Sequence, residues 1–196
     1  MLRREFLGSG ITAIYDVTRY GARGDGVRND RAALQRAIDE CARRGGGTVW
    51  LPPGRYRSGS LRLNSGVALW LDHGATLVAS ADPRDYEVRA GERTPRDGWG
   101  SVFLLTENAE RVAIGGYGVI QGAGLARPRS PGQPLAPFRP RLVAFEHCRD
   151  VVVDGITLRD ADRWTLHLYH TDSARITRLR ILARYDIGNT DGIDID

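Results

Sequence analysis

Hydrophobic and polar positions follow two different patterns along the chain, and the pattern changes near Gly45. Before this point, apolar residues recur every three or four positions, at Ala33, Leu34, Ala37, Ile38 and Cys41. This spacing predicts an amphipathic helix. Asn29 or Asp30 is its predicted N-cap, and Gly45-Gly46-Gly47 predicts its end, because glycine tolerates the left-handed conformation that follows many helices.

After Thr48, the apolar residues gather in short runs that alternate with polar positions. Gly, Asp, Asn or Arg separates the runs, a pattern typical of many short strands with almost no helix between them. The predicted strands cover residues 48–51, 67–71, 76–78, 102–105, 112–114, 119–120, 142–145, 151–153, 156–158, 165–168, 176–177 and 181–182.

A repeat underlies these strands. Residues 150–158 align with residues 174–182 at an offset of 24, residues 111–120 have the same form, and residues 67–77 give a looser copy. A Pro-rich segment, 127–140, interrupts the spacing as an inserted loop would. A period of this size with several short strands indicates a solenoid, in which each coil buries its apolar face against the next.

Other repetitive or all-β folds fit less well. A leucine-rich horseshoe requires a regular Leu/Asn ladder, which this sequence lacks. A β-sandwich would show hairpin turns such as Asn-Gly between paired strands, and none occurs there. We therefore predict a parallel β-helix.

The charge pattern narrows the classes of partner. No lysine occurs, so all 28 basic residues are arginine, and the net charge is +4. The arginines are dispersed, without a basic run or an aromatic-basic module, which disfavours nucleic acid. Arginine binds carboxylates and phosphates bidentately, so an acidic polymer fits the composition. Cys41 and Cys148 show no metal-binding spacing and are predicted to be buried thiols.

The N-terminus carries one targeting feature. Arg3-Arg4-Glu5-Phe6-Leu7 matches a twin-arginine export signal, but the apolar stretch that follows, 7–15, is short and contains Gly8 and Gly10. Residues 1–14 are therefore interpreted as a shortened twin-arginine-type signal, and residues 15–196 as the β-helix domain. The hypothesis is export to the periplasm or the cell exterior. No stretch approaches the ~18 apolar residues of a membrane span.

Two stretches resemble known enzymes. Residues 16–30, 35–38 and 45–56 resemble the N-terminal cap of pectin-degrading β-helix enzymes, a cap also found in lyases and phage tail-spikes. Asn189-Thr190-Asp191-Gly192 resembles the Asn-Thr-Asp-Gly motif of glycoside hydrolase family 28, the polygalacturonases and their relatives. Residues 114–124, 139–141 and 163–167 agree with that family, although Gln121 stands where it more often has aspartate.

The resemblance covers residues 15–196 and implies a specific fold and chemistry. The implied fold is an all-β, right-handed parallel β-helix with an N-terminal capping α-helix, incomplete at its C-terminus. The implied reaction is inverting hydrolysis of α-1,4-galacturonosidic bonds in pectin-type polysaccharides, which needs two carboxyl groups ~6.5–9.5 Å apart. Asp191 matches the aspartate that positions or deprotonates the attacking water, and Asn189 and Asp194 are the candidate substrate-binding residues.

The resemblance also sets limits. The family's Asp-Asp, Gly-His-Gly and Arg-Ile-Lys motifs do not occur in this sequence, so the chain alone is expected to be inactive. The expected partner is polygalacturonate or a similar acidic polysaccharide, with no cofactor and no metal. His167 and His170 are interpreted as packing residues. Two alternatives remain open: a uronate lyase or epimerase that shares the cap, and a non-catalytic glycan-binding or structural β-helix.

Overall fold

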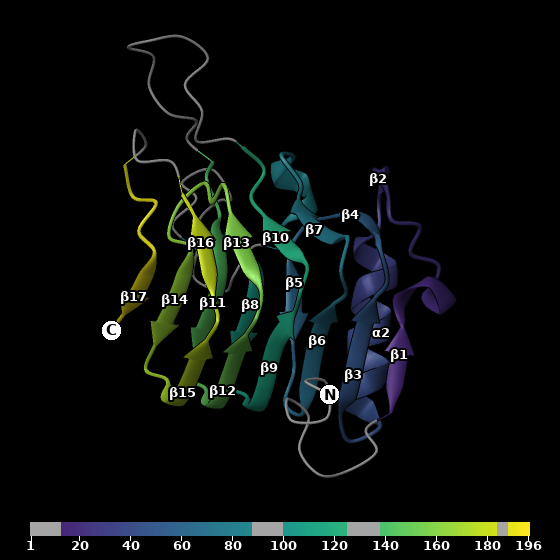
Figure 1. The fold of residues 1–196 in the computed structure, drawn as a ribbon, viewed down its shortest axis with the longest axis horizontal. Helices are drawn as coiled ribbons and strands as arrows, with labels where there is room; N and C mark the ends of the chain where they lie inside the picture. Colours follow the sequence, from purple (N-terminus) through teal and green to yellow (C-terminus); the bar gives the residue numbers. More distant parts are fainter. Residues whose placement is uncertain (1–12, 88–99, 125–137, 184–187) are drawn as a thin grey trace, which may run out of the picture.

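The strands form three parallel sheets that run the length of the molecule (Figure 1). A computed structural model of the chain describes residues 13–87, 100–124, 138–183 and 188–196. The first sheet contains, in spatial order, β1 (Ile14–Asp16), β3 (Gly47–Leu51), β6 (Val67–Leu71), β9 (Glu110–Gly116), β12 (Arg149–Asp154) and β15 (Asp172–Thr177). The second contains β2 (Asp25–Asn29), β4 (Gly54–Ser58), β7 (Ala75–Ala79), β10 (Val119–Gln121), β13 (Thr157–Arg159) and β16 (Arg180–Leu182).

The third sheet completes each coil. It contains β5 (Leu61–Leu63), β8 (Val102–Glu107), β11 (Arg141–Glu146), β14 (Leu166–Tyr169) and β17 (Ile193–Ile195). From β3 onward the chain visits the three sheets in a fixed order, and neighbouring strands pair in parallel, as β11 does with β8 and with β14. This confirms the predicted parallel β-helix.

A single α-helix among the described residues covers the N-terminal end of the stack (Figure 1). Helix α2 (Arg31–Arg43) turns its apolar stripe into the main core, as its spacing predicts. Asp30 is the N-cap residue, but its carboxylate accepts from the backbone N–H groups of Arg23 and Gly24 instead of from the helix. It therefore ties the preceding loop, which contains the short 3₁₀ helix η1 (Val17–Tyr20), to the cap.

The observed register corrects the predicted repeat. Val151 pairs with Ala174 and Val153 with Ile176, an offset of 23 residues, not 24. A shift of one residue matters because it turns every side chain of a strand to the opposite face. At an offset of 23, Leu158 meets Ile181, and apolar residues stack on apolar residues along the interior.

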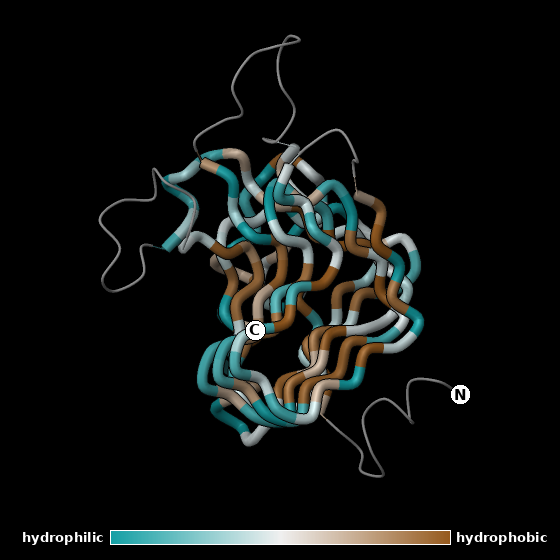
Figure 2. Tube along the Cα trace, turned by 90° about the vertical axis from the view of Figure 1, so that its left-hand side faces the viewer, coloured by the Kyte–Doolittle hydropathy of each residue, from teal (hydrophilic) through white to brown (hydrophobic). Residues whose placement is uncertain are grey.

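Each coil contributes apolar side chains to one continuous core. Hydrophobic positions recur at corresponding places in successive coils, as the view along the stack shows (Figure 2). Phe103, Phe145 and Tyr56 are among the largest fully buried side chains. Cys41 and Cys148 are free and buried, as predicted, and burial raises the pKa of the Cys41 thiol to about 12.

The connections from the second sheet to the third differ most in length. They span residues 59–60, 80–101, 122–140, 160–165 and 183–192. Most of the predicted inserted loop, 127–137, lies outside the described residues, as does the predicted export signal up to residue 12.

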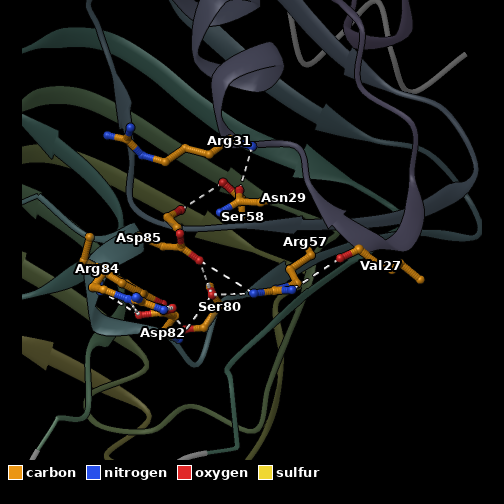
Figure 3. A network of polar contacts seen from close by, with 11 residues as sticks. Val27, Asn29, Arg31, Arg57, Ser58, Ser80, Asp82, Arg84 and Asp85 are labelled. Carbon is orange, nitrogen blue, oxygen red and sulfur yellow. Dashed lines mark hydrogen bonds and ion pairs between the residues drawn. The ribbon is translucent and has the colours of Figure 1, made fainter.

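The second of these connections is fixed where it leaves the coil (Figure 3). Ser80 Oγ donates to Asp85 Oδ2 at 2.5 Å, and Arg57 Nη2 donates to Ser80 Oγ at 3.3 Å. The buried Tyr86 hydroxyl donates to the carbonyl oxygen of Ser80 at 2.9 Å. These contacts hold the short helix η2 (Pro83–Asp85) against β4 and β7. Within the described part of the chain, no helix is both long and apolar enough to cross a membrane.

Candidate functional site

The Asn-Thr-Asp-Gly motif enters the last strand of the third sheet. The backbone N–H of Thr165 donates to the Asp191 carbonyl oxygen at 3.0 Å, and that of Leu166 donates to the Gly192 carbonyl oxygen at 3.2 Å. The preceding coil therefore fixes the backbone position of Asp191. Strand β17 follows at once and pairs with β14 in parallel.

This pairing decides which way the side chains point. Ile193 and Ile195 lie opposite Leu166 and Leu168, both of which are buried in the core. Because side chains alternate along a strand, Asp194 and Asp196 lie on the outer face of the sheet. This is the shared face that the alternation of isoleucine and aspartate predicts.

His167 lies on the same outer face, directly opposite Asp194 in the strand pair. Its Nε2 is 2.8 Å from Asp196 Oδ2, and its Nδ1 is 2.6 Å from Arg141 Nη1. Arg141 Nη2 in turn donates to Glu146 Oε1 at 2.9 Å, and this ion pair is buried. A continuous polar chain therefore runs from β11 through β14 to the carboxylate of Asp196, which follows β17.

Asp194 has a partly buried carboxyl group. Its Oδ2 is buried and has no hydrogen-bond partner among the described residues. Burial raises the pKa of Asp194 above its usual value; the charges of Asp191 and Asp196 raise it further, while His167 opposes them. A pKa raised in this way makes the protonated form of the carboxyl group more accessible near neutral pH.

Arg163 lies near two other arginines, Arg139 and Arg141. Burial, with the charges of Arg139 and Arg141, lowers the pKa of Arg163. Arg139 Nη1 donates to the carbonyl oxygens of Asp162 at 3.3 Å and Gly188 at 3.1 Å. Positive charge thus lies at the turn that precedes the motif and next to His167, an arrangement suited to an anionic ligand.

The structure brings together two of the three predicted site residues. Asp191 and Asp194 interact electrostatically. Asn189 is exposed in the turn that precedes them, with a positive φ of 62°, and within the described segments no hydrogen bond joins its side chain to either carboxylate. No group of three or more His, Cys, Asp or Glu side chains in the described ranges is placed to hold a metal ion.

Sequence reasoning missed the chain of Glu146, Arg141 and His167. His167 is buried, but it takes part in a hydrogen-bonded network, which corrects its interpretation as a packing residue. His170 is exposed and its ring stacks on that of His147 at 5.2 Å. A polar residue between two core leucines is the signal that marks His167 as facing outward.

The raised pKa of Asp194 predicts how an Asp194→Asn variant behaves. The folded state binds a proton more tightly than the unfolded state, so wild-type stability falls as pH rises through the usual carboxyl pKa of 3.8 and up to the raised value. The Asp194→Asn variant has no carboxyl group at this position, so this fall in stability does not occur in it. We expect a higher melting temperature for Asp194→Asn at neutral pH and no difference below pH 3.8, measured by circular dichroism. An equal difference at all pH values would contradict the explanation.

Comparisons with known proteins agree with this geometry. Residues 14–123 match the family described as rhamnogalacturonase A/epimerase, pectate lyase-like, and residues 83–196 match glycosyl hydrolases family 28. A Vitis vinifera protein named "Probable polygalacturonase" is 29% identical over 188 residues, which cover 90% of this chain and 38% of the relative. The chain thus spans well under half of that relative's length.

Two further relatives define how far the similarity extends. An exopolygalacturonase from Thermotoga maritima has a TM-score of 0.78 at 24% identity, covering 92% of this chain and 49% of the other, which supports the fold. Mannuronan C5-epimerase AlgE4 from Azotobacter vinelandii is 42% identical, but over only 38% of this chain and 15% of its own length. The family 28 match includes the whole Asn-Thr-Asp-Gly motif and strands β8, β11, β14 and β17 of the sheet that carries it. The chain belongs to glycosyl hydrolases family 28.

Proposed function

We propose that this chain supplies part of the active site of a hydrolase that cleaves α-1,4-galacturonosidic bonds with inversion. In this proposal Asp191 positions or deprotonates the attacking water, and Asn189 and Asp194 contact the substrate. The observation that carries the proposal is the placement of Asp191, Asp194 and Asp196 together at the outer edge of the third sheet. Paired carboxyl groups are the functional groups that glycoside hydrolysis requires.

The surrounding charges support a uronate as the substrate. A galacturonate residue carries one carboxylate; Arg139 contacts the turn that precedes the motif, and Arg163 lies near Arg139 and Arg141. Guanidinium groups bind carboxylates in a bidentate geometry, so they favour an acidic sugar over a neutral one. The arginines are dispersed along the sequence without a basic run, so the proposed partner is an acidic polysaccharide and not nucleic acid.

An epimerase is the second candidate, because residues 14–123 match a family whose description includes epimerases. The gene product that contains this sequence should be incubated with polygalacturonate and, separately, with polymannuronate. We expect new reducing ends from polygalacturonate, without unsaturated sugars, and no change in polymannuronate. Unsaturated ends would indicate a lyase, and an altered uronate composition without cleavage would indicate an epimerase. Binding without any reaction would support the non-catalytic alternative.

We also propose that residues 1–14 act as an export signal ahead of a domain of residues 15–196. The paired arginines Arg3 and Arg4, followed by Phe6-Leu7, support this proposal. It agrees with the substrate, because polymeric pectin is found outside the cell that would degrade it. Replacing both arginines with lysine should retain the protein inside the cell, as measured by fractionation; unchanged export would contradict the proposal.

A further inference from the structure

We propose that His167 is a positioning residue that holds Asp196 beside Asp194 at the candidate active site, and that Arg141 and Glu146 fix its orientation. The inference deepens the proposed function and rests on it only for the identity of the reaction. It starts from the two hydrogen bonds of the His167 ring, to Arg141 Nη1 at 2.6 Å and to Asp196 Oδ2 at 2.8 Å.

Arg141 determines which tautomer His167 adopts. A guanidinium group has only N–H donors, so His167 Nδ1 must accept the bond from Arg141. A neutral imidazole that accepts at one nitrogen carries its proton on the other. His167 Nε2 therefore donates to the Asp196 carboxylate. This assignment comes from the hydrogen-bond partners, since no proton position is observed.

The guanidinium of Arg141 is itself held in place. It forms a buried ion pair with Glu146, with side-chain exposures of only 7% and 8%. Both residues belong to β11, the strand next to β14 in the third sheet. An ion pair buried in this way has few alternative arrangements, because leaving either charge alone would be costly. The ion pair on the preceding coil therefore determines that His167 Nδ1 accepts a hydrogen bond.

Aromatic contacts restrict the ring further. The His167 ring lies 4.8 Å from that of Trp164 and 6.0 Å from that of Tyr169, measured between centroids. Its side chain is 6% exposed, whereas that of Asp196 is 58% exposed. A rigid donor therefore meets a carboxylate that water would otherwise leave free to rotate. The contact fixes one Asp196 rotamer next to Asp194.

This arrangement affects the charge around Asp194. The charge of Asp196 is one of the causes that raise the pKa of Asp194. By holding Asp196 in place, His167 keeps that charge close, and its own contribution acts in the opposite direction. Positioning of this kind matters because misplacing a reacting group by about 1 Å can lower a rate by roughly 10²-fold.

Two substitutions of His167 test the roles of its two ring nitrogens separately. In His167→Gln, the amide nitrogen occupies the place of Nε2 and can donate to Asp196. In His167→Asn, the shorter side chain keeps an acceptor for Arg141 but cannot reach Asp196. With the gene product that contains this sequence and oligogalacturonate, we expect His167→Asn to lower kcat by about 10²-fold with KM nearly unchanged. His167→Gln should stay within roughly tenfold of wild type.

His73→Asn is the matched control. His73 is exposed, stacks on Tyr117 and takes no part in the candidate site. This substitution should leave kcat unchanged. If both His167 variants lose the same activity in proportion to a fall in melting temperature, His167 is a structural residue and the proposal is wrong.

A second measurement does not depend on activity. The imidazole ¹⁵N spectrum of the 196-residue chain should show His167 with a protonated Nε2 and an unprotonated Nδ1. Asp196→Ala should speed the exchange of the Nε2 proton with water by at least about tenfold. A proton on Nδ1, or exchange that Asp196→Ala does not change, overturns the proposal. If the gene product hydrolyses no polygalacturonate, the proposed function fails, while this spectrum still decides the contact.

Discussion

Replacing Asp191 with asparagine in the gene product that contains this sequence is expected to lower kcat on polygalacturonate by about 10³-fold. Asparagine has nearly the same shape as aspartate, but it can neither accept a proton from water nor carry a negative charge. The backbone carbonyl of Asp191, which accepts from Thr165, is unaffected by the change. Initial rates of reducing-sugar release over a range of substrate concentrations give kcat and KM separately.

The fold should survive this substitution. Asp191 is exposed, and exposed substitutions usually change stability by less than about 0.5 kcal/mol. Asp39→Asn, at an exposed position on the cap helix, provides the same chemical change away from the site. We expect it to leave kcat unaltered. If Asp191→Asn retained more than a tenth of wild-type activity, Asp191 would not be the residue that handles the water.

Replacing Gly116 with alanine is expected to cost at least about 4 kcal/mol of stability. Gly116 ends β9 with a φ of +116°, and a Cβ atom there would lie 2.0 Å from the Leu71 carbonyl oxygen. That oxygen cannot move aside, because it accepts from the backbone N–H groups of Tyr117 and Gly118. The clash therefore separates neighbouring coils at β6 and β9. Urea unfolding followed by circular dichroism measures the loss.

Gly45→Ala isolates the backbone contribution. Gly45 also has a positive φ, +90°, but a Cβ atom there would meet nothing within 4 Å. Alanine should cost only the strain of that conformation, about 1–2 kcal/mol. Equal losses for the two variants would show that contact with Leu71 does not limit the stacking of the coils.

The sequence pattern predicted most strands that have an apolar face, but it missed β5 (Leu61–Leu63), whose two leucines are buried. Strand β6 (Val67–Leu71) is apolar throughout and was predicted with its observed bounds. Strand β2 (Asp25–Asn29) is mostly exposed and exists through its pairing with β4 (Gly54–Ser58). Strand β4 has arginines on its outer face and was missed as well. Strands β2 and β4 form because they pair with neighbouring strands. The pattern of a single strand does not encode that pairing.

The register of strand pairing could not be predicted from the pattern of one strand either, because it depends on contacts between coils. An alignment at 24 residues matches Leu158 with Leu182, whereas the observed offset of 23 stacks Val153 on Ile176. The cap helix, by contrast, has local signals at both ends, so its extent was predicted closely. Its N-cap carboxylate nevertheless binds the preceding loop, a choice that depends on where that loop lies.

The candidate site was likewise predicted only in part from the sequence. A short motif identified Asp191, and alternation placed Asp194 and Asp196 on one face. Their roles in catalysis stay predictions. The partnership of Asp196 with His167 joins residues 29 positions apart on successive coils, through a connection whose length does not reveal the register. Arg141 lies a further coil away. Networks that cross coils are therefore visible only in the folded structure.

The stereochemistry of the first product tests the central claim most directly. The gene product that contains this sequence should be mixed with oligogalacturonate, and the anomeric protons of the newly formed reducing end followed by NMR before mutarotation. An inverting hydrolase turns the α-linkage into a β-configured product, because water attacks the face opposite the leaving group. We expect the β-anomer to appear first. An initial α-anomer, or an unsaturated product without a new reducing end from water, would contradict the account.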